Sequence, residues 1–216
     1  IKNRPQWYTV SGRSKTYVDK VLNTISGEYF KNREINKVLR SENSIRLYYG
    51  SANEYFDYDK VIFAVHANEI LNLIKDPTEN EKKILQNFKY EKNTAYLHTD
   101  LRLMPSRKNV WSSWNSILNK EDSKNICITY WLNKLQNLKT EKNYFLTLNP
   151  TISIDNNKII KKIEFTHPSY DTRTIDAQKY LSELQGVKNT WFCGSYFGYG
   201  FHEDGLKSAI DVANKL

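Results

Sequence analysis

The stretch 190–213 concentrates residue types that could hold a ligand. A short apolar strand runs into a glycine-punctuated turn, which leads into an amphipathic helix. Gly194, Gly198, Gly200 and Gly205 permit positive φ angles or a close backbone approach. The start of a helix presents free N–H groups and a positive dipole end, so an anionic or electron-rich group is welcome there. The spacing is neither G-x-G-x-x-G nor a Walker loop, and the glycine count alone favours an ordinary strand-to-helix turn.

The same segment carries His202, whose imidazole could orient a substrate or relay a proton near neutral pH. A histidine that caps its own helix is an equally good interpretation. His66 and His167 form no metal-binding spacing with Cys127 or Cys193. No Ser-His-Asp or Cys-His motif with a known family spacing is visible, although such groups can assemble in space.

Hydrophobic periodicity predicts the elements that must position these residues. We expect a first helix after Gly12, capped by Ser14, and a helix beginning near Asp76-Pro77-Thr78-Glu79. Other helices are predicted at 67–74, 171–184 and 205–216. Strands are predicted at 35–40, 44–49, 55–58, 60–65, 94–98, 110–115, 126–133, 144–148, 159–166 and 189–193.

This order of elements predicts an α+β fold with α/β pieces at its two ends. Residues 76–168 are expected to form one lobe, built around a five-stranded antiparallel sheet. Residues 1–75 and 169–216 are expected to form the other lobe, whose parallel sheet would need an absent partner to complete it.

Composition places the chain among globular proteins, with 39% hydrophobic and 26% charged residues. No apolar run approaches the roughly 20 residues of a membrane span, and the two cysteines form no disulfide framework, so we expect a cytoplasmic protein. The net charge of +8 could indicate nucleic acid or an anionic membrane surface. The lysines are scattered, however, which favours a solvated basic surface without a nucleic-acid partner.

Short motifs occur along the whole chain. They are Arg4-Pro5-Gln6-Trp7, Leu97-His98-Thr99-Asp100, Met104-Pro105, Trp111-Ser112-Ser113-Trp114-Asn115, Thr129-Tyr130-Trp131-Leu132-Asn133, Leu148-Asn149-Pro150, Trp191-Phe192-Cys193-Gly194-Ser195 and Gly198-Tyr199-Gly200-Phe201-His202-Glu203-Asp204-Gly205. Together they resemble the flavin-containing amine oxidase superfamily, in particular its bacterial NAD/FAD-binding, amine-oxidase-like branch. In that superfamily a strand ends in Gly followed by Glu, Thr or Ser, a loop crosses the flavin, and a helix starts near Glu-Gly-Ala.

The resemblance implies an FAD cofactor and a flavin-dependent oxidoreductase. It assigns cofactor contacts to Gly194, Ser195, Gly200, Phe201, Glu203, Asp204 and Gly205. It also assigns an adenine contact to the backbone of Val38, for which a core role in a strand is an equally good interpretation. His202 would be the catalytic residue, at a place where related enzymes carry an aromatic residue of the substrate cage.

The resemblance further implies that the antiparallel sheet roofs the flavin and lines a substrate cavity. We expect His98, Trp114, Tyr130 and Asn133 to line it, and aromatic walls with few polar groups suit a largely apolar substrate. A buried structural role is nevertheless the commoner one for any single aromatic residue. Because side chains alternate along a strand, Trp111 and Trp114 should point to opposite faces, and so should Tyr130 and Trp131.

Two departures from the family pattern stand out. Ser195 replaces the acidic residue of many amine oxidases, and the N-terminal G-x-G-x-x-G segment that grips the pyrophosphate is missing. The chain begins at Ile1 and its only methionine is Met104, so we expect a C-terminal fragment that binds FAD weakly or not at all alone. Its partners would be a small-molecule substrate and the missing N-terminal half, and its uncovered surface would favour a homodimer.

Two other functions stay open. The same superfamily includes flavin-dependent desaturases and isomerases that act on lipid-like molecules, which an apolar aromatic cavity would also suit. A non-catalytic basic binding module is the second alternative, and net charge is its only support.

Overall fold

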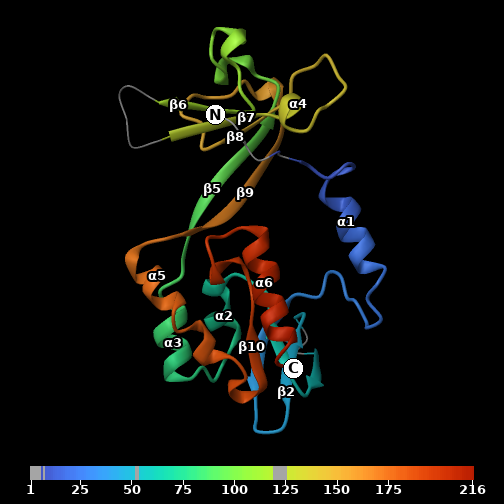
Figure 1. The fold of residues 1–216 in the computed structure, drawn as a ribbon, viewed down its shortest axis with the longest axis vertical. Coiled ribbons are helices and arrows are strands. Elements are labelled where there is room, and N and C mark those ends of the chain that lie inside the picture. Colours follow the sequence, from blue (N-terminus) through green and yellow to red (C-terminus); the bar gives the residue numbers. More distant parts are fainter. Residues whose placement is uncertain (1–5, 7, 52–53, 119–125) are drawn as a thin grey trace. The chain divides into compact units, whose positions relative to one another are not determined.

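The computed structural model describes residues 6, 8–51, 54–118 and 126–216, so Arg4, Pro5 and Trp7 of the first motif lie outside the described residues. Contacts divide the chain into two units (Figure 1). Unit 1 comprises Ile1–Lys31 and Asn93–Phe165, and unit 2 comprises Asn32–Lys92 and Thr166–Leu216. Among the described residues no helix is long and apolar enough to cross a membrane.

Unit 1 is built on a five-stranded sheet in the order β6-β7-β8-β5-β9. The registers of β6 with β7, β7 with β8 and β8 with β5 are antiparallel, which confirms the predicted antiparallel sheet. Its strands are β5 (Lys89–His98), β6 (Trp114–Leu118), β7 (Ile126–Trp131), β8 (Phe145–Leu148) and β9 (Ile159–Ser169).

Shorter elements complete unit 1. They are the helices α1 (Arg13–Leu22) and α4 (Leu132–Leu135) and the 3-10 turns η1 (Leu101–Leu103), η2 (Lys108–Val110) and η3 (Asn156–Lys158). The predicted cap of the first helix is wrong, because α1 begins one residue before Ser14 and is preceded by Gly12, whose φ of 79° is left-handed. No residue of α1 is buried.

Unit 2 contains two sheets and four helices. Antiparallel strands β1 (Ile35–Arg40), β2 (Ile45–Tyr49) and β3 (Glu54–Tyr58) form one sheet, and parallel strands β4 (Val61–Phe63) and β10 (Thr190–Phe192) form the other. The helices are α2 (Ala67–Leu73), α3 (Glu79–Leu85), α5 (Thr172–Gln178) and α6 (His202–Ala213), with 3-10 turns η4 (Leu181–Leu184), η5 (Val187–Asn189) and η6 (Ser195–Phe197).

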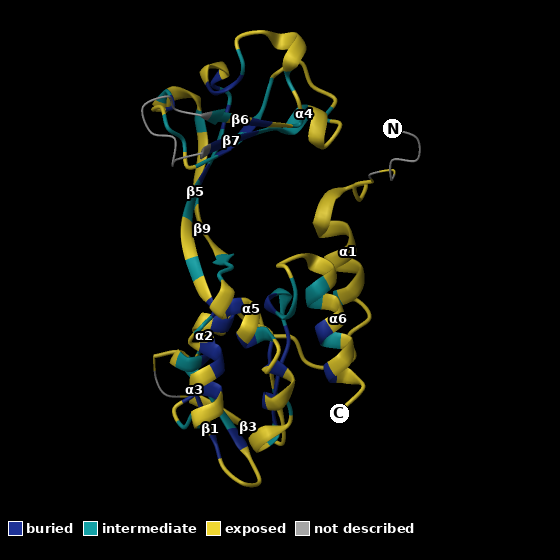
Figure 2. Cartoon of the chain, turned by 60° about the vertical axis from the view of Figure 1, so that its left-hand side comes forward, coloured by how far each residue is buried: buried dark blue, intermediate teal, exposed yellow. Residues whose placement is uncertain are grey.

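The core of unit 2 joins both sheets to the helices, and Figure 2 shows part of it as buried segments of α2, α3 and β1. Phe63 of β4 and Phe192 of β10 stack with ring centroids 5.6 Å apart. Ile70 of α2 and Leu85 of α3 are fully buried in the same cluster. The parallel pair is therefore held by apolar packing on its inner side. This packing positions the glycine turn and α6, which follow β10.

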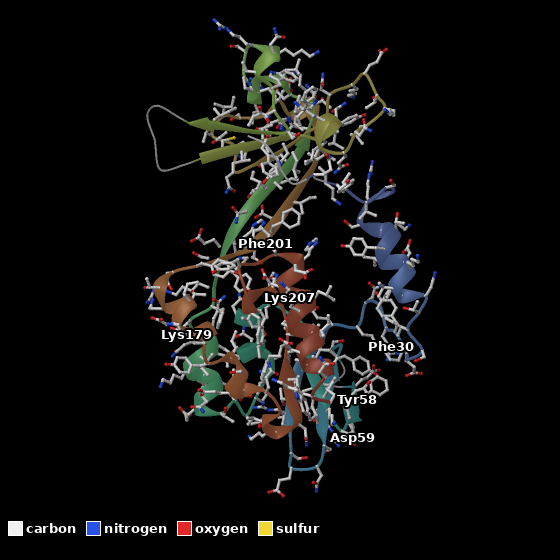
Figure 3. All side chains as sticks on the ribbon, viewed as in Figure 1. Phe30, Tyr58, Asp59, Lys179, Phe201 and Lys207 are labelled. Carbon is white, nitrogen blue, oxygen red and sulfur yellow. The ribbon has the colours of Figure 1, made fainter. Side chains whose placement is uncertain are left out.

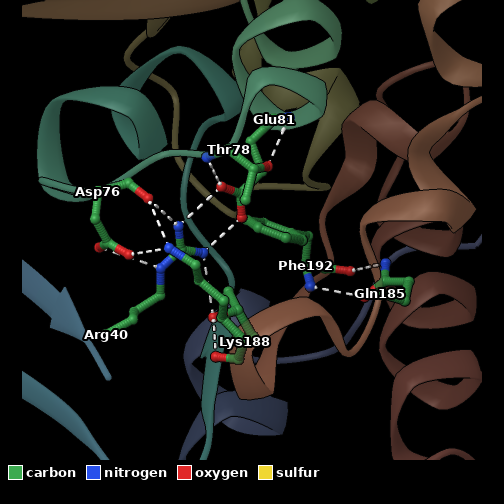
Figure 4. A network of polar contacts seen from close by, with 8 residues as sticks. Arg40, Asp76, Thr78, Glu81, Gln185, Lys188 and Phe192 are labelled. Atoms are coloured by element: carbon green, nitrogen blue, oxygen red, sulfur yellow. Dashed lines mark hydrogen bonds and ion pairs between the residues drawn. The ribbon is translucent and has the colours of Figure 1, made fainter. Parts of the chain in front are cut away.

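A buried ion pair ties the antiparallel sheet to α3 (Figure 4). The side chains of Arg40 and Glu81 are fully buried, and Arg40 Nη2 donates to Glu81 Oε2 at 2.8 Å. Arg40 also donates to the carbonyl of Asp76 at 2.9 Å and to Thr190 Oγ1 at 3.4 Å. Burial by itself raises the pKa of Glu81, but the Arg40 guanidinium and the Thr78 N–H outweigh it and lower that pKa.

This network explains why the unit boundaries differ from the predicted lobes. Residues 76–92, expected with the antiparallel sheet of unit 1, group with unit 2. Arg40 binds α3 through Glu81, and Thr174 Oγ1 of α5 donates to the carbonyl of Asn87 at 3.0 Å. Residues 1–31 were expected in the lobe formed by 1–75 and 169–216, but they group with unit 1.

Several predicted element boundaries are wrong for local reasons. The last helix begins at His202 rather than 205, because Asp204 Oδ2 accepts from the N–H of Phe201 at 2.9 Å and so caps an earlier start. The predicted helix 171–184 divides into α5 and η4. The predicted strand 126–133 ends at Trp131, and α4 follows from Leu132. The strand predicted at 110–115 begins only at Trp114.

Replacing Glu81 with glutamine should lower the free energy of unfolding by about 3 kcal/mol, because the buried Arg40 would lose its buried carboxylate and keep only the partly exposed Asp76, 3.4 Å from its Nε, as a counter-charge. Urea denaturation measures this change. Glu79→Gln is the matched control on the same helix, since its pair with Lys82 is exposed and worth less than about 0.5 kcal/mol. A Glu81→Gln variant as stable as that control would show that the ion pair does not stabilise the fold.

Candidate functional site

The buried side-chain hydroxyl of Ser208 fixes the turn that follows β10. The main-chain N–H of Gly194 donates to Ser208 Oγ at 2.9 Å, and that hydroxyl lies 2.8 Å from the carbonyl of Gly205. Gly194 has a φ of 155°, and a Cβ there would collide with the ring of Tyr196. Gly205 faces the main-chain nitrogen of Ser195, so the end of the strand and the start of α6 lie close together.

Asp204 organises the next part of the turn. Its Oδ2 accepts from the N–H groups of Tyr199 at 3.0 Å and Phe201 at 2.9 Å. Gly198 lies against this carboxylate, and a Cβ at that position would collide with it. The described contacts of Asp204 are thus to the turn itself, and its assigned contact with a cofactor stays a prediction.

A third side chain pins the turn from α5. Gln178 Nε2 donates to the carbonyls of Tyr196 at 2.9 Å and Gly198 at 2.6 Å. Three side chains from two helices therefore fix a backbone that its glycines alone would leave free. Sequence reasoning missed Gln178 and Ser208, because nothing in their spacing indicates that they reach this turn.

The outer surface of the turn is aromatic. Tyr199 is 76% exposed and Phe201 is 70% exposed, and both precede the exposed His202. Figure 3 marks Phe201 at the start of α6 and Lys207 further along it. The structure thus brings Phe201, His202, Glu203 and Gly205 together at one helix end, as the sequence predicts, but their roles stay predictions.

Electrostatics limits what this helix end can bind. Glu203 and Asp204 both lie in the first turn of α6, so two carboxylates lie near its positive dipole end, with Lys207 Nζ 3.7 Å from that of Glu203. A doubly charged phosphate is poorly matched to that arrangement. An uncharged, electron-rich ring edge lying against Tyr199 and Phe201 is better matched, because it gains apolar contact without adding a third anion.

Val38, the predicted adenine contact, lies in the core. It is 1% exposed, and its carbonyl accepts from the N–H of Lys75 at 3.1 Å. The side chain belongs to the main core cluster of unit 2. This placement fits the alternative interpretation of Val38 as a packed strand residue, and the adenine contact stays a prediction.

His98 lies within the sheet of unit 1 rather than on an open surface. Its side chain is fully buried, with Nε2 2.7 Å from Thr147 Oγ1. The N–H of Asp100 donates to Nδ1 at 3.1 Å, so Nδ1 carries no proton and Nε2–H donates to Thr147. Thr147 Oγ1 in turn lies 2.8 Å from Thr129 Oγ1.

Burial lowers the pKa of His98 to about 4, and the Asp100 carboxylate opposes only part of that shift. Asp100 itself forms short hydrogen bonds with Arg102, which hold the pKa of that carboxyl well below its usual range. His98 is therefore neutral at pH 7, and its two described hydrogen bonds are both used within unit 1.

The sheet register separates the expected substrate residues. Thr129 pairs with Asn115, and Tyr130 pairs with Trp114, so these two pairs lie on opposite faces. His98 lies on the same buried face as Thr129, whereas Trp114 and Tyr130 form an edge-to-face pair on the other face, 6.4 Å apart. The expected set of four residues thus does not converge on one site.

Trp111 and Trp114 do lie on opposite faces of the sheet, as predicted, but Trp111 follows η2 and precedes β6, so the two do not alternate along one strand. Trp111 packs edge-to-face on Trp131 at 5.2 Å and on Phe145 at 5.8 Å, all on the His98 side of the sheet. Its indole N–H donates to the carbonyl of Pro105 at 2.7 Å. Trp114 on the other face is 59% exposed.

Asn133 lies in α4, outside the sheet. Its Oδ1 accepts from the N–H of Tyr144 and its Nδ2 donates to the carbonyl of Lys142, both at 2.8 Å. The amide therefore closes the loop between α4 and β8, which is a structural use of a residue predicted to contact substrate.

The face that carries Trp114 and Tyr130 is an apolar surface that sequence reasoning only partly found. By register, its other half-buried aliphatic members are Leu97, Ile128, Leu146 and Leu148. The sequence signal was apolar residues at alternate positions, Ile128 and Tyr130 in β7 and Leu146 and Leu148 in β8. These residues could form a wall for an apolar molecule.

Other chemistry finds little support. Burial raises the pKa of the Cys193 thiol, which disfavours a nucleophilic thiolate. No cluster of potential metal ligands occurs among the described residues. A hollow of about 500 Å³ lies between α3 and α5, but no predicted site residue lines it.

No family model and no curated protein matches the sequence. Solved structures do match. A CLA-producing fatty acid isomerase from P. acnes has a TM-score of 0.65 at 11% identity, covering 94% of this chain and 52% of that one. Wild-type putrescine oxidase bound to putrescine has a TM-score of 0.59 at 10% identity, covering 94% and 53%. Cyclohexylamine oxidase from Brevibacterium oxydans has a TM-score of 0.52 at 10% identity, covering 84% and 48%.

These matches establish the class of fold. The chain has a mixed α+β fold similar to part of the flavin amine oxidases and related isomerases, as the sequence resemblance predicts. At 10–11% identity the likeness concerns the fold alone. The chain spans about half the length of the structures that it matches.

The buried neutral His98 should make the protein sensitive to mild acid. Its folded-state pKa is about 4 against an ordinary 6.5, so the unfolded chain binds the proton more readily between these values. Stability is then full above about pH 6.5 and falls by on the order of 3 kcal/mol as the pH drops towards 4. Urea unfolding at several pH values measures this loss. His98→Asn should remove the loss in this window, and an unchanged profile in that variant would contradict the assignment.

Trp114 and Trp111 should differ sharply in their importance for stability. Trp111→Ala should lower the free energy of unfolding by about 3 kcal/mol, because it removes a hydrogen-bonded, packed indole. Trp114→Ala should cost less than about 1 kcal/mol, since that side chain is largely in solvent. Thermal and urea unfolding of both variants compare them. Equal losses would mean that the two faces of the sheet are not distinguished in solution.

Proposed function

We propose that this chain is the C-terminal portion of an FAD-dependent oxidoreductase similar in fold to the flavin amine oxidases. The isolated chain is inactive, and a dinucleotide-binding segment that precedes it in the full protein completes the cofactor site. The observation that carries this proposal is the parallel β4–β10 pair, which leads through the fixed glycine turn into α6. It lies within a fold that matches about half the length of putrescine oxidase.

The residues of the turn fit one part of FAD better than another. Tyr199 and Phe201 offer exposed aromatic surface beside the helix start, which suits a flat ring. The carboxylates of Glu203 and Asp204 do not suit a pyrophosphate. The buried hydroxyl of Tyr170 has no hydrogen-bond partner among the described residues and lies beside Gly200, so a polar group under the turn is left to be satisfied.

When bound, the flavin supplies the electron-accepting chemistry of the reaction. The chain's own residues hold the cofactor and orient the substrate. Gly194 and Gly205 let strand and helix approach closely, while Gln178, Asp204 and Ser208 keep the turn rigid. His202, exposed at the first position of α6, is the group we propose to orient substrate or move a proton.

The substrate is a small, largely apolar molecule. The half-buried face with Trp114, Tyr130, Leu146 and Leu148 provides apolar contact and few hydrogen-bond partners. His98 and Asn133 are not part of this proposal, because both are committed to hydrogen bonds within unit 1.

An isomerase or desaturase acting on a lipid-like molecule is the second candidate. The match to a fatty acid isomerase over 94% of this chain favours it, together with the aliphatic character of the same face. A substrate amine would call for a carboxylate or an aromatic cage near the reacting carbon, whereas a lipid chain calls for apolar surface only.

A basic binding module is less well supported. Many cationic side chains are neutralised locally, as Lys82 is by Glu79, Lys179 by Asp176 and Lys188 by Asp76. Interspersed charges of both signs give a weaker field than a clustered basic face.

Reading the coding DNA upstream of Ile1 and producing the two segments together tests the proposal. We expect roughly 200 further codons with a strand, G-x-G-x-x-G and a helix, and a yellow complex that retains flavin absorbance after desalting. The chain alone should stay colourless. A colourless complex in the presence of excess FAD would contradict the flavin assignment.

Phe201→Ala probes this chain's own contribution. The variant should weaken FAD retention by the complex about tenfold, because an exposed ring is lost at the turn. Its free energy of unfolding should change by less than about 0.5 kcal/mol. Ile160→Ala is the control, since this side chain is 51% exposed on β9 and distant in sequence from the turn.

A further inference from the structure

His66 lies at the end of β4 that adjoins the glycine turn. Strands β4 and β10 are parallel and pair Phe63 with Phe192, so both leave the sheet at the same edge. Three residues beyond this pair, the chain reaches His66 on one side and Ser195 of the turn on the other. Ligands of α/β sheets bind outside the carboxyl ends of the parallel strands, and His66 stands at such an end.

The segment 166–170 connects this histidine to the outer part of the turn. At one end of the segment, Thr166 Oγ1 lies 3.3 Å from His66 Nδ1. At the other end, the hydroxyl of Tyr170 is so close to Gly200 that a Cβ on that glycine would lie 3.0 Å from it. One short stretch of chain therefore contacts both His66 and the turn.

The His66 ring is held by neighbours from α2, β5 and β9. Tyr90 of β5 stacks on it, with ring centroids 4.5 Å apart and 21° between the ring planes. Tyr90 is itself fixed, because its hydroxyl accepts from the N–H of Ala67 at 3.2 Å. Glu69, in the first turn of α2, places Oε1 3.8 Å from Nδ1. No hydrogen bond to Nε2 occurs among the described residues, and the side chain is 47% exposed.

These neighbours favour one tautomer of the neutral imidazole. A carboxylate beside Nδ1 favours the form that carries its proton there and leaves a lone pair on Nε2. When Nε2 takes up a proton, the new positive charge lies beside Glu69, which stabilises it. Tyr90, the other titratable group described against the ring, stays neutral at pH 7, because burial raises its pKa. By contrast, no hydrogen bond or ion pair holds the His202 side chain in the described part of the molecule.

We propose that His66 is a proton-accepting residue of the site at the glycine turn, with Nε2 facing the substrate and Glu69 beside Nδ1–H. This inference rests on the proposed function, which supplies the flavin as two-electron acceptor. A substrate that gives up a hydride there must also lose a proton from the neighbouring N–H, O–H or C–H bond. Nε2 takes that proton, and the electron pair of the broken bond stays on the substrate as the new double bond. His202 is left to orient the substrate.

The tautomer of His66 is measurable on the chain by itself. The sequence has four histidines, so ¹⁵N-labelled histidine gives few signals, which single substitutions assign. With the ring neutral, we expect Nδ1–H to be the major form at His66. Glu69→Gln should lower the share of that form at least about twofold. Glu79→Gln removes an exposed carboxylate from the first turn of α3 and is the matched control. A wild-type ring that is mainly Nε2–H would overturn the inference.

The complex with the upstream segment tests whether the ring reaches the cofactor site. Adding FAD should shift the Cε1–H signals of His66 and His202, whereas His98, enclosed by hydrogen bonds within unit 1, should not respond. Photoreduction of the bound FAD at pH 7 should take up more protons than in His66→Gln, by up to about one per flavin, because added negative charge favours a charged imidazole beside it. Counting protons per bound flavin removes any effect of the variant on FAD retention.

The outcomes separate this inference from the flavin proposal. A complex that retains FAD while His66→Gln takes up as many protons per flavin as wild type would overturn the inference alone. A complex that retains no FAD would overturn the flavin proposal and, with it, the role given to His66, even where the Nδ1–H tautomer is found. Proton uptake that is lost in His202→Gln and kept in His66→Gln would assign the proton to His202, and the inference would be wrong.

Discussion

The ion pair between Arg40 and Glu81 is the constraint on which unit 2 depends. Its guanidinium reaches from the antiparallel sheet to α3 and to Thr190 at the start of β10. A charge buried to this degree is tolerated only with its partners in place, so the pair selects one arrangement of three elements that are distant in sequence. Because β10 is one of them, the glycine turn that follows it inherits its position from an interaction made well away from the turn.

The turn itself shows how a permissive backbone is made rigid. Glycines at 194, 198 and 200 allow the path, but they also leave the unfolded chain many alternatives. Gln178, Asp204 and Ser208 offset that entropy by satisfying main-chain groups of the turn from two helices. The result is a fixed, exposed aromatic surface at Tyr199 and Phe201, with the carboxylates of Glu203 and Asp204 in the adjoining first turn of α6.

Sequence patterns predicted the elements and the antiparallel sheet well, because alternation and helical periodicity are local signals. They failed where a distant partner decides the outcome. Residues 76–92 belong with unit 2 because Glu81 meets Arg40, 41 positions away in the sequence. A local signal was missed as well, since α6 starts at His202 because Asp204 accepts from the N–H of Phe201. His98 was expected at a cavity, yet Thr147 and Asp100 enclose it, and nothing in its own neighbourhood in the sequence indicates that.

The two short parallel strands, β4 and β10, differ in how their outer edges are protected. An exposed strand edge needs protection against further pairing, and Gln185 protects β10 by making the two hydrogen bonds that one residue of an adjacent antiparallel strand would make to Phe192. The outer edge of β4 has no such protection, since no hydrogen bond reaches the N–H or C=O of Ile62 among the described residues. The difference lies in side-chain chemistry and not in strand length, since both strands have three residues.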